Sequence, residues 1–429
     1  MTTEYIGDSA APSILILCTT FGLEQSSKGL VRELADALSD CGAKVQVCLI
    51  DWTGPVGASP RFETLPNGIE VLSVAPWMIS GLGEFVANAS KWVGSSFFAV
   101  GALQRYFGDR QIDLLLDFSP LVVTAWPIKW AKRHFRCRGY AYLTDFFPFH
   151  QSGAGQDIGG KLGFRAGLAI ETHLLRHFET VACMSPAGID YVKRHYALRR
   201  EQEVYLLRLW GDTRLPAPQD RSELRLSHRL PADRPIILFG GQIAEGRGIE
   251  ELLAVARQAK MVRPDLVFLF MGKGRLEPLV QARIHAGLDN VILKSPVSRD
   301  EYLALVTACD IGVVATVADT GVPSFPSKTI DYLRAGIPIV ASVESTTDYS
   351  VFVEENGFGV ATTAGDPDAF LAALLRVVDD PETRKVMSER GRAALIRHFD
   401  VAGAARTLLT QAFRLDSRQP SHSGPPGQT

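Results

Sequence analysis

The chain has 429 residues, more than a single hydrophobic core organises, so two domains of roughly 200 residues each are expected. Its composition, 46% hydrophobic and 21% charged with a formal net charge of -2, is that of a soluble globular protein and argues against a general nucleic-acid binder. The six cysteines form no C-x-x-C pair, no apolar run approaches the roughly 20 residues of a membrane span, and the polar stretch 1–12 is unlike a secretory signal, which together indicate a cytoplasmic location.

Short apolar runs alternate with amphipathic stretches through the first half of the chain. Residues 14–18 and 45–50 have the length and composition of buried strands, and a helix over 29–41 lies between them. This order predicts a parallel sheet whose functional edge lies at the carboxyl ends of its strands. The loop 19–29 occupies that edge and contains no G-x-G-x-x-G, which argues against a dinucleotide cofactor. Further strands are expected at 69–74, 112–117, 140–143, 181–185 and 204–209.

Aromatic and cationic residues gather in two neighbouring stretches of the first half. Residues 77–107 are amphipathic and rich in Trp and Phe, and the helix expected from about residue 120 carries several Lys, Arg and His at 129–138. A cationic, Trp-bearing helix beside an aromatic one is typical of a surface that rests on an anionic bilayer. The alternative is that the aromatic side chains fill the core and the cations are solvated.

Two polar segments follow in the first half. Residues 144–150 come directly after the strand 140–143 and lead into a Gly-rich segment, so they belong to the substrate edge of the sheet. On the next helix, Glu171, His173 and His177 are close in sequence, and metal ligation is conceivable. Without a further ligand in range, the group is more typical of a solvated helix face, and no metal site is predicted.

A polar, proline-bearing stretch divides the chain into two halves, and a second series of strands and helices starts after it. The fold class predicted is therefore α/β, with two Rossmann-like domains facing a cleft. The expected divisions are an N-terminal domain at 1–209, a linker at 210–234, a C-terminal domain at 235–400, a helix at 401–415 that could cross back to the first domain, and a disordered tail at 416–429.

The loop GGQIAEGRG, residues 240–248, follows a buried strand and precedes a helix. Glycines let backbone N–H groups approach an anion closely, and Arg247 could hold it with two hydrogen bonds. The loop therefore indicates a phosphate site at the carboxyl edge of the second sheet.

The stretch 319–342, DTGVPSFPSKTIDYLRAGIPIVAS, is expected to form a loop, a short helix, a tight stop and a buried strand. Ser327 is placed to cap the helix that Lys328 opens, and Gly336 suits a left-handed residue at its end. The bare first turn and its dipole favour a phosphate, and Lys328 adds a mobile positive charge. Asp331, one turn on, could accept two hydrogen bonds from a ribose diol. The competing interpretation is a surface ion pair between Lys328 and Asp331.

Several segments together carry a resemblance to a known family. They are ILFGGQIAEGRGIEELL, FLFMGKGRLEPLV, ACDIGVVA, PSKTIDYLRAGIPIVAS and NGFGVATTAGDPDAF, with LTDFFPFH and TVACMSPAGIDYVKRHY in the first half. Over roughly residues 12–415 the chain resembles a retaining glycosyltransferase of family 4 with the GT-B fold, nearest to the bacterial branch that builds capsule and exopolysaccharide units on a polyprenyl carrier. PSK followed by DYLRAGIP is the more specific signal.

The resemblance implies roles for individual residues and shows two departures from the family pattern. Arg247 would contact the donor pyrophosphate, and Asp331 would hold the ribose from the second acidic position of an E-x7-E pattern. The first acidic position falls on Pro323, so contacts to the donor sugar would come from the backbone of 324–328. Gln242 stands where the family usually has Arg.

The resemblance implies a nucleotide-sugar donor, a glycan or polyprenyl-linked acceptor, and neither metal, organic cofactor nor nucleic acid. The acceptor hydroxyl would attack from the face that the leaving group occupies, with a diphosphate oxygen as the base, so no pair of catalytic carboxylates is needed. The catalytic candidates are Asp145, Arg247 and Lys328. The donor-binding candidates are Gly240, Gly241, Gln242, Arg247, Gly272, Ser324, Phe325, Pro326, Ser327, Lys328 and Asp331. The acceptor-side candidates are Thr20, Phe21, Gly22 and His150.

Three other classes of function remain open from the sequence. A sugar-nucleotide epimerase or hydrolase could share the fold. A non-catalytic binding protein is the second class, because Pro323 and Gln242 both weaken the usual donor contacts. A dinucleotide oxidoreductase is least favoured, since the glycine fingerprint is missing.

Overall fold

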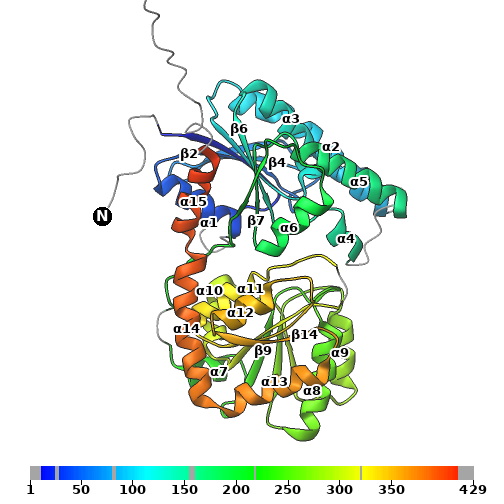
Figure 1. Cartoon of the computed structure of the whole chain (residues 1–429), viewed down its shortest axis with the longest axis vertical. Coiled ribbons are helices and arrows are strands. Elements are labelled where there is room, and N and C mark those ends of the chain that lie inside the picture. The colour runs from blue at the N-terminus through cyan, green and yellow to red at the C-terminus, as the bar shows by residue number, and fades with distance from the viewer. Residues whose placement is uncertain are drawn as a thin grey trace, which may run out of the picture.

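The computed structural model describes residues 11–24, 29–79, 84–153, 160–216, 219–318 and 321–413. They form two α/β lobes, one above the other in Figure 1. The expected tail at 416–429, most of the Gly-rich segment after residue 153, and Asp319 and Thr320 of the stretch 319–342 lie outside these ranges. Each lobe is built on its own largely parallel sheet, so the prediction of two Rossmann-like domains is confirmed.

Eight strands among the described residues make the N-terminal sheet, in the order β3-β4-β2-β1-β5-β6-β7-β8. Every neighbouring pair is parallel except β3 and β4. The antiparallel edge strand β3 was not predicted, because all four of its residues are exposed and no apolar run marks it. The strands are β1 (Ser13–Cys18), β2 (Lys44–Ile50), β3 (Arg61–Thr64), β4 (Glu70–Val74), β5 (Leu114–Phe118), β6 (Arg138–Leu143), β7 (Thr180–Cys183) and β8 (Glu203–Leu206).

Helices cover both faces of this sheet because side chains alternate between the faces along each strand. Ile14 and Ile16 belong to a buried cluster with α1 and α15, whereas Leu15 and Leu17 pack with α2, α3 and α5. The helices of the N-terminal lobe are α1 (Leu30–Asp40), α2 (Glu84–Phe107), the 3-10 turn η2 (Leu121–Thr124), α3 (Ala125–His134), α4 (Phe149–Gly153), α5 (Gly160–Leu175) and α6 (Pro186–His195). The C-terminal helix α15 (Val401–Phe413) lies beside α1.

The C-terminal sheet has the order β11-β10-β9-β12-β13-β14, and all its pairs are parallel. Strands β10 and β11 lie on one side of β9 and the later strands lie on the other, so the topology switches between β9 and β12. Open α/β sheets bind ligands at the carboxyl ends of the strands at such a switch point. The strands are β9 (Ile236–Gly240), β10 (Val267–Met271), β11 (Val291–Lys294), β12 (Ile311–Ala315), β13 (Ile339–Val343) and β14 (Gly359–Thr363).

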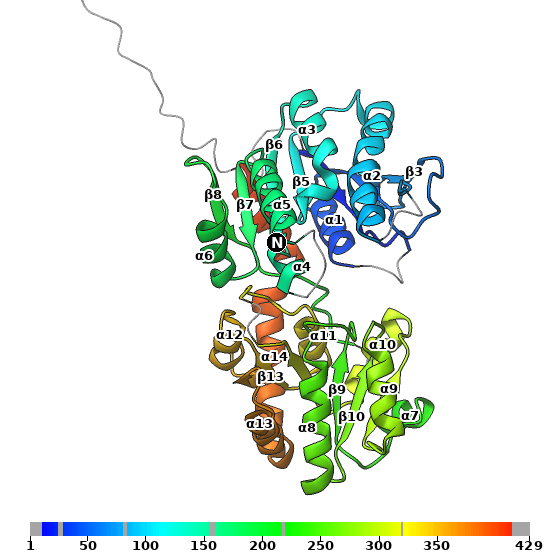
Figure 2. The ribbon, with the colours of Figure 1, turned by 90° about the vertical axis from the view of Figure 1, so that its right-hand side faces the viewer.

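Eight helices of the described residues surround this second sheet. They are α7 (Arg221–Ser227), α8 (Ile249–Val262), α9 (Glu277–His285), α10 (Arg299–Thr307), α11 (Lys328–Ala335), α12 (Tyr349–Glu355), α13 (Pro367–Asp379) and α14 (Pro381–Phe399). From the side, α4 and α6 of the upper lobe face α11 and α12 of the lower one (Figure 2).

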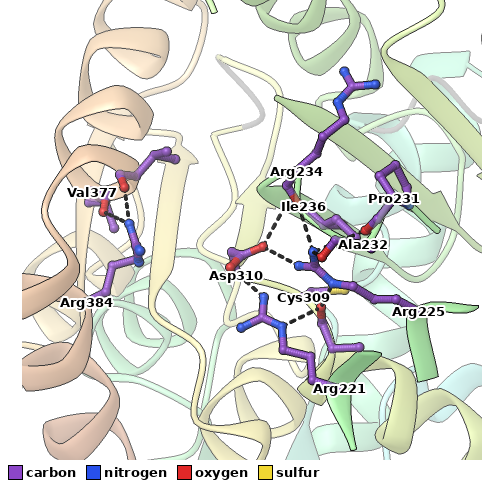
Figure 3. Close-up of polar contacts among 12 residues, drawn as sticks. Arg221, Arg225, Pro231, Ala232, Arg234, Ile236, Cys309, Asp310, Val377 and Arg384 are labelled. Atoms are coloured by element: carbon purple, nitrogen blue, oxygen red, sulfur yellow. Dashed lines mark hydrogen bonds and ion pairs between the residues drawn. The ribbon is translucent and has the colours of Figure 1, made fainter. Parts of the chain in front are cut away.

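The linker predicted at 210–234 is wrong over most of its length. Trp210 is buried, and its Nε1 donates to the carbonyl of Leu30 over 2.8 Å. Further on, Arg225 is also buried and donates to the carbonyl of Ala308 and, over 2.7 Å, to Asp310 (Figure 3). The same carboxylate accepts from Arg221 and from the backbone N–H of Ile236. Residues 219–234 therefore belong to the C-terminal domain, joined to it by contacts between residues far apart in sequence.

The last helix ties the end of the chain to the first lobe. In Figure 1, α14 and α15 run as one column from the lower lobe to the upper one. Tyr140 of β6 donates to the side chain of Gln411 over 2.6 Å, and Arg138 donates to the carbonyl of Ala412 over 3.1 Å. Where the chain first crosses between the lobes, the N–H of Gly211 donates to the carbonyl of Phe399. The two crossings thus lie against each other.

Candidate active site

The loop after β9 is pressed against the loop after β10. The N–H of Gly241 donates to Met271 and that of Ile243 donates to Lys273, both over 2.9 Å. A Cβ at Gly272 would lie 1.7 Å from the carbonyl oxygen of Gly241, so only glycine allows this backbone contact. Gly272, predicted to bind the donor, is buried and supports the loop from behind.

The far end of the same loop is pressed onto β12. Gly248 is the residue before α8 and has a left-handed backbone with φ of +62°. An added Cβ there would come within 2.6 Å of the Cβ of Ala315, the last residue of β12. The preceding Arg247 is exposed, as are Gly241 and Gln242. The loop therefore presents its glycine backbone and one guanidinium at the switch point between β9 and β12.

Lys328, the first residue of α11, reaches back over the end of β9. Its Nζ lies 3.6 Å from the centroid of the Phe239 ring, and a Cβ at Gly241 would be 3.7 Å from that Nζ. Burial, with the charge of Arg247 as the second cause, lowers the pKa of Lys328 to about 7. The expectation of a mobile, solvated lysine is therefore wrong. The side chain is partly buried and held in contact with an aromatic ring.

The start of α11 also differs from the prediction. Ser327 has helical backbone angles and its side chain makes no capping hydrogen bond, so the proposed cap is wrong. The first turn is closed by backbone bonds from Thr329 to Pro326 and from Ile330 to Ser327. No capping side chain therefore covers the positive end of the helix dipole. Gly336 ends the helix in a left-handed conformation with φ of +72°, as expected.

Tyr332 fixes α11 to the sheet and was not identified from the sequence. It is fully buried, and its hydroxyl accepts from the N–H of Gly240 over 2.9 Å while lying 3.3 Å from the carbonyl of Leu238. It lies one turn beyond Lys328, so both side chains point from α11 toward β9. The i, i+4 spacing from Lys328 is the signal that could have identified it.

Asp331 is engaged in an ion pair with Arg299 rather than with Lys328, the partner that the competing interpretation of the sequence considered. Its two oxygens accept from the two terminal nitrogens of Arg299, over 2.5 and 2.8 Å. Glu33 of α1, in the other lobe, lies near this pair. Burial raises the pKa of Glu33 to about 7, Arg299 opposes the shift, and Asp212 and Asp331 add to it. Asp331 therefore belongs to a charged cluster that joins the lobes.

The loop before α11 directs its aromatic side chain into the core. Phe325 is buried and its ring packs against Tyr349 and Phe352, so its side chain belongs to the core. The carbonyl of Ser324 accepts from Thr347 over 2.6 Å. Pro326 is partly buried at the start of the turn into α11.

Asp145 and His150 come from the other lobe and approach the same region. His150 Nδ1 accepts from the N–H of Phe146 over 3.0 Å and lies 3.5 Å from Asp145 Oδ1. Burial lowers the pKa of His150, Asp145 opposes the shift, and Arg247 lowers the pKa further. The imidazole is therefore neutral in this arrangement. Arg247 therefore lies within electrostatic range of His150, across the lobe junction.

A hollow of about 240 Å³, lined by both polar and apolar residues, lies beside Asp145 at the switch point of the N-terminal sheet. Thr20 lines it as predicted. Phe21 and Gly22 instead contact the buried Arg32, whose guanidinium lies 5.4 Å from the Phe21 ring centroid and donates to the Gly22 carbonyl over 3.0 Å. The other lining residues are Cys18, Thr19, Leu30, Val31, Asp117, Phe118, Ser119, Pro120, Val123, Thr124 and Thr144.

Glu171 does not lie on the solvated helix face that was expected for it. Glu171 is buried, and its carboxylate accepts from the N–H groups of Leu121 and Val122 over 2.8 and 3.0 Å. Over the described ranges, no group of three His, Cys, Asp or Glu side chains is arranged to hold a metal ion. Nor does any helix in those ranges combine the length and hydropathy of a membrane span.

Comparison with known proteins gives a family match for the second half of the chain. Residues 220–394 match the family model described as Glycosyl transferases group 1. The matched range begins at the start of α7, where contacts with Asp310 begin the C-terminal domain, and it contains both candidate phosphate loops. The glycosyltransferase match therefore covers the second lobe and leaves the first lobe outside it.

Two curated relatives and one solved structure extend the comparison. A GDP-mannose-dependent monoacylated alpha-(1-6)-phosphatidylinositol monomannoside mannosyltransferase of Corynebacterium glutamicum is 24% identical over 46% of this chain and 52% of its own length. The putative colanic acid biosynthesis glycosyl transferase WcaI of Escherichia coli K12 is 25% identical over 70% of this chain and 74% of its own length. The structure of HepE from Anabaena in complex with UDP superposes with a TM-score of 0.64 at 16% identity, over 94% of this chain and all of HepE, which shows a shared fold.

The position of Lys328 generates a prediction about protons. A diphosphate ester bound against Lys328 favours its charged form and so raises its pKa above about 7. At about pH 8, where the free side chain is mostly neutral, binding should take up close to one proton, and affinity should fall as the pH rises above 7. Calorimetry in two buffers of different ionisation enthalpy, with UDP-glucose and GDP-mannose, measures this uptake.

Two variants test whether Lys328, rather than His150, takes up the proton. Lys328→Met should abolish the uptake, whereas His150→Gln should leave it in place. Uptake that persists in Lys328→Met would contradict the assignment of this titration to the lysine.

Proposed function

We propose that this chain is a glycosyltransferase that moves a sugar from a nucleotide-diphosphate sugar to a glycan or polyprenyl-linked acceptor with retention of configuration. The observation that carries the proposal is the convergence of Lys328, Arg247 and the uncapped first turn of α11 at the β9–β12 switch point. Arg247 and Lys328 have no anionic partner among the described residues. A diphosphate supplies the missing negative charge for all three groups at once.

Breaking the bond between the sugar and the diphosphate leaves negative charge on the diphosphate and positive character on the sugar ring. Fixed positive potential at the leaving group stabilises that separation more than it stabilises the bound donor. The fold holds Lys328 there before the donor arrives, which reduces reorganisation during the reaction, and Arg247 is anchored on the adjoining loop through its backbone. Asp331 would reach a ribose with the lone pairs that Arg299 leaves free.

The acceptor is proposed to enter from the N-terminal lobe. The hollow beside Asp145 is lined by threonine and serine hydroxyls, which suit a hydroxylated molecule. Asp145 is half exposed and can orient the incoming hydroxyl, whereas the neutral His150 can donate from Nε2. A diphosphate oxygen would accept the proton of that hydroxyl, consistent with attack from the same face of the sugar.

The relatives favour a surface polysaccharide or lipid-linked acceptor. One is named for the biosynthesis of colanic acid and the other for mannosyl transfer to a phosphatidylinositol mannoside. With the PSK and DYLRAGIP segments, these names support a role in bacterial capsule or exopolysaccharide assembly for a family 4 enzyme. We place this activity in the cytoplasm, at the inner face of the cell membrane.

The proposal predicts the effect of removing each cation on turnover. Arg247→Ala and Lys328→Ala should each reduce donor turnover at least about tenfold, the scale of losing one charge-assisted contact. Arg257→Ala, which removes an exposed arginine further along α8, is the matched control and should retain activity. Full turnover in both site variants would refute the assignment.

A second candidate function is contact with a membrane surface. Several aromatic residues of the stretch 77–107 are exposed rather than in the core, including Phe97 at 57% and Phe98 at 52%. Their rings form a continuous series from Trp77 through Phe98 and Phe97 to Trp126, with centroid separations of 5.4 to 5.8 Å. Lys129 lies 5.6 Å above the Trp126 ring, which places a cation at the edge of this aromatic surface.

Vesicle binding tests the aromatic surface. The chain should sediment with vesicles that contain phosphatidylglycerol and much less with pure phosphatidylcholine, because the exposed rings and nearby cations act together. A Phe97→Ser, Phe98→Ser double variant should lose most of this binding. The control is Met261→Ser with Val262→Ser, which removes two exposed apolar side chains from α8. Equal binding by the two double variants would place the contact elsewhere.

A further inference from the structure

A buried carboxylate at the lobe junction is not used by the scheme above. Glu344 follows β13 directly and is only 3% exposed. Among the described residues, its Oε2 has no hydrogen-bond partner, and neither does the buried Oγ of Ser324 on the loop before α11. The N–H of Glu344 donates to Thr316 Oγ1 over 3.0 Å, which fixes the backbone at this point.

The sheet order places Glu344 at a defined position relative to the diphosphate candidates. Strand β13 is two strands from β9, with β12 between them. At about 4.8 Å per strand, Glu344 lies on the order of 10 Å along the sheet edge from Gly240. A hexose attached to a phosphate at the β9–β12 switch point spans a distance of that order. Glu344 is therefore in reach of the sugar part of a donor, beyond its phosphates.

The N-terminal lobe contacts the C-terminal lobe close to Glu344. Tyr191 of α6 lies within electrostatic range of Glu344, because burial and next the charge of Glu344 raise the pKa of its phenol. Tyr191 in turn packs against Phe146, with ring centroids 5.0 Å apart, in the loop that carries Asp145 and His150. Near the start of α6, the N–H of Ala187 donates to Asp348 of the C-terminal lobe over 3.0 Å.

The described residues compensate the cost of burying this carboxylate only in part. An unpaired buried carboxylate is unfavourable, and burial raises the pKa of Glu344 to about 7, while the nearby hydroxyls of Thr346 and Ser324 oppose the shift. Glu344 forms no salt bridge with any of the described residues. Buried carboxylates that lack a hydrogen-bond partner in the free protein occur at binding sites, where a ligand supplies the missing partner.

We propose that Glu344, with Ser324, binds a pair of hydroxyls on the sugar of the donor and thereby selects which sugar is transferred. The inference rests on the proposed function, because it assigns a substrate group to the same site. The loop residues Pro323 to Pro326 carry one polar side chain, the Ser324 hydroxyl, so a carboxylate for sugar recognition has to come from another element. A carboxylate accepts from two neighbouring hydroxyls at once.

Comparing a nucleotide sugar with the corresponding free nucleotide tests the assignment. A panel of UDP-glucose, UDP-N-acetylglucosamine, GDP-mannose, dTDP-glucose and ADP-glucose first identifies a donor that the wild-type chain binds. Glu344→Gln should then weaken binding of that nucleotide sugar by about tenfold or more and change binding of its free diphosphate less than about threefold. Ser324→Ala should show the same split with a smaller loss. Glu355→Gln, the same change at an exposed position on α12, is the control and should alter neither affinity.

Deoxy analogues of the sugar provide the decisive comparison. With the hydroxyl that contacts Glu344 removed, wild type and Glu344→Gln should bind equally, because the interaction is already absent. Equal weakening of nucleotide sugar and free nucleotide in both variants would show that Glu344 only supports the loop, and would overturn the inference. If the wild-type chain binds none of the five donors and none of their diphosphates, the proposed function itself fails.

Discussion

Lys328 and Arg247 bring two positive charges to one end of the C-terminal sheet with no anion of the described chain between them. Burial already disfavours the lysine charge, and the neighbouring guanidinium disfavours it further, so the pKa of Lys328 is lowered to about 7. A folded protein holds such a pair only where surrounding packing enforces it. Under the proposed function, a bound diphosphate would convert this repulsion into attraction.

Packing around the lysine explains why it stays in place. Phe239 lies beneath its ammonium, and Tyr332 ties the helix that carries it to the backbone of β9. The glycine loop can lie this close only because Gly272 and Gly248 leave room for neighbouring backbone and for Ala315. The N-terminal lobe then completes the site, with His150 within electrostatic range of Arg247 and α15 linking the two lobes.

Local patterns in the sequence predicted the parts of the structure that local physics determines. Apolar runs and helix-ending glycines predicted the strands of the N-terminal sheet except β3, the two largely parallel sheets, and the loops that follow β9 and precede α11. The same reasoning could not predict contacts between residues that are far apart in the sequence. Arg299 lies 32 positions before Asp331 and donates to its carboxylate. Arg225 donates to Asp310, so it belongs to the C-terminal domain instead of the expected linker. Ser327 failed as a cap because its own backbone is already helical, and Glu344 has no flanking motif that marks it.

The most direct test of the central claim is a crystal structure of this chain soaked with UDP or GDP. We predict that the terminal phosphate lies within hydrogen-bond distance of Lys328 Nζ and of the first backbone N–H groups of α11, with Arg247 turned toward it. A nucleotide whose phosphates point away from α11, or that occupies the hollow beside Asp145 instead, would contradict the account.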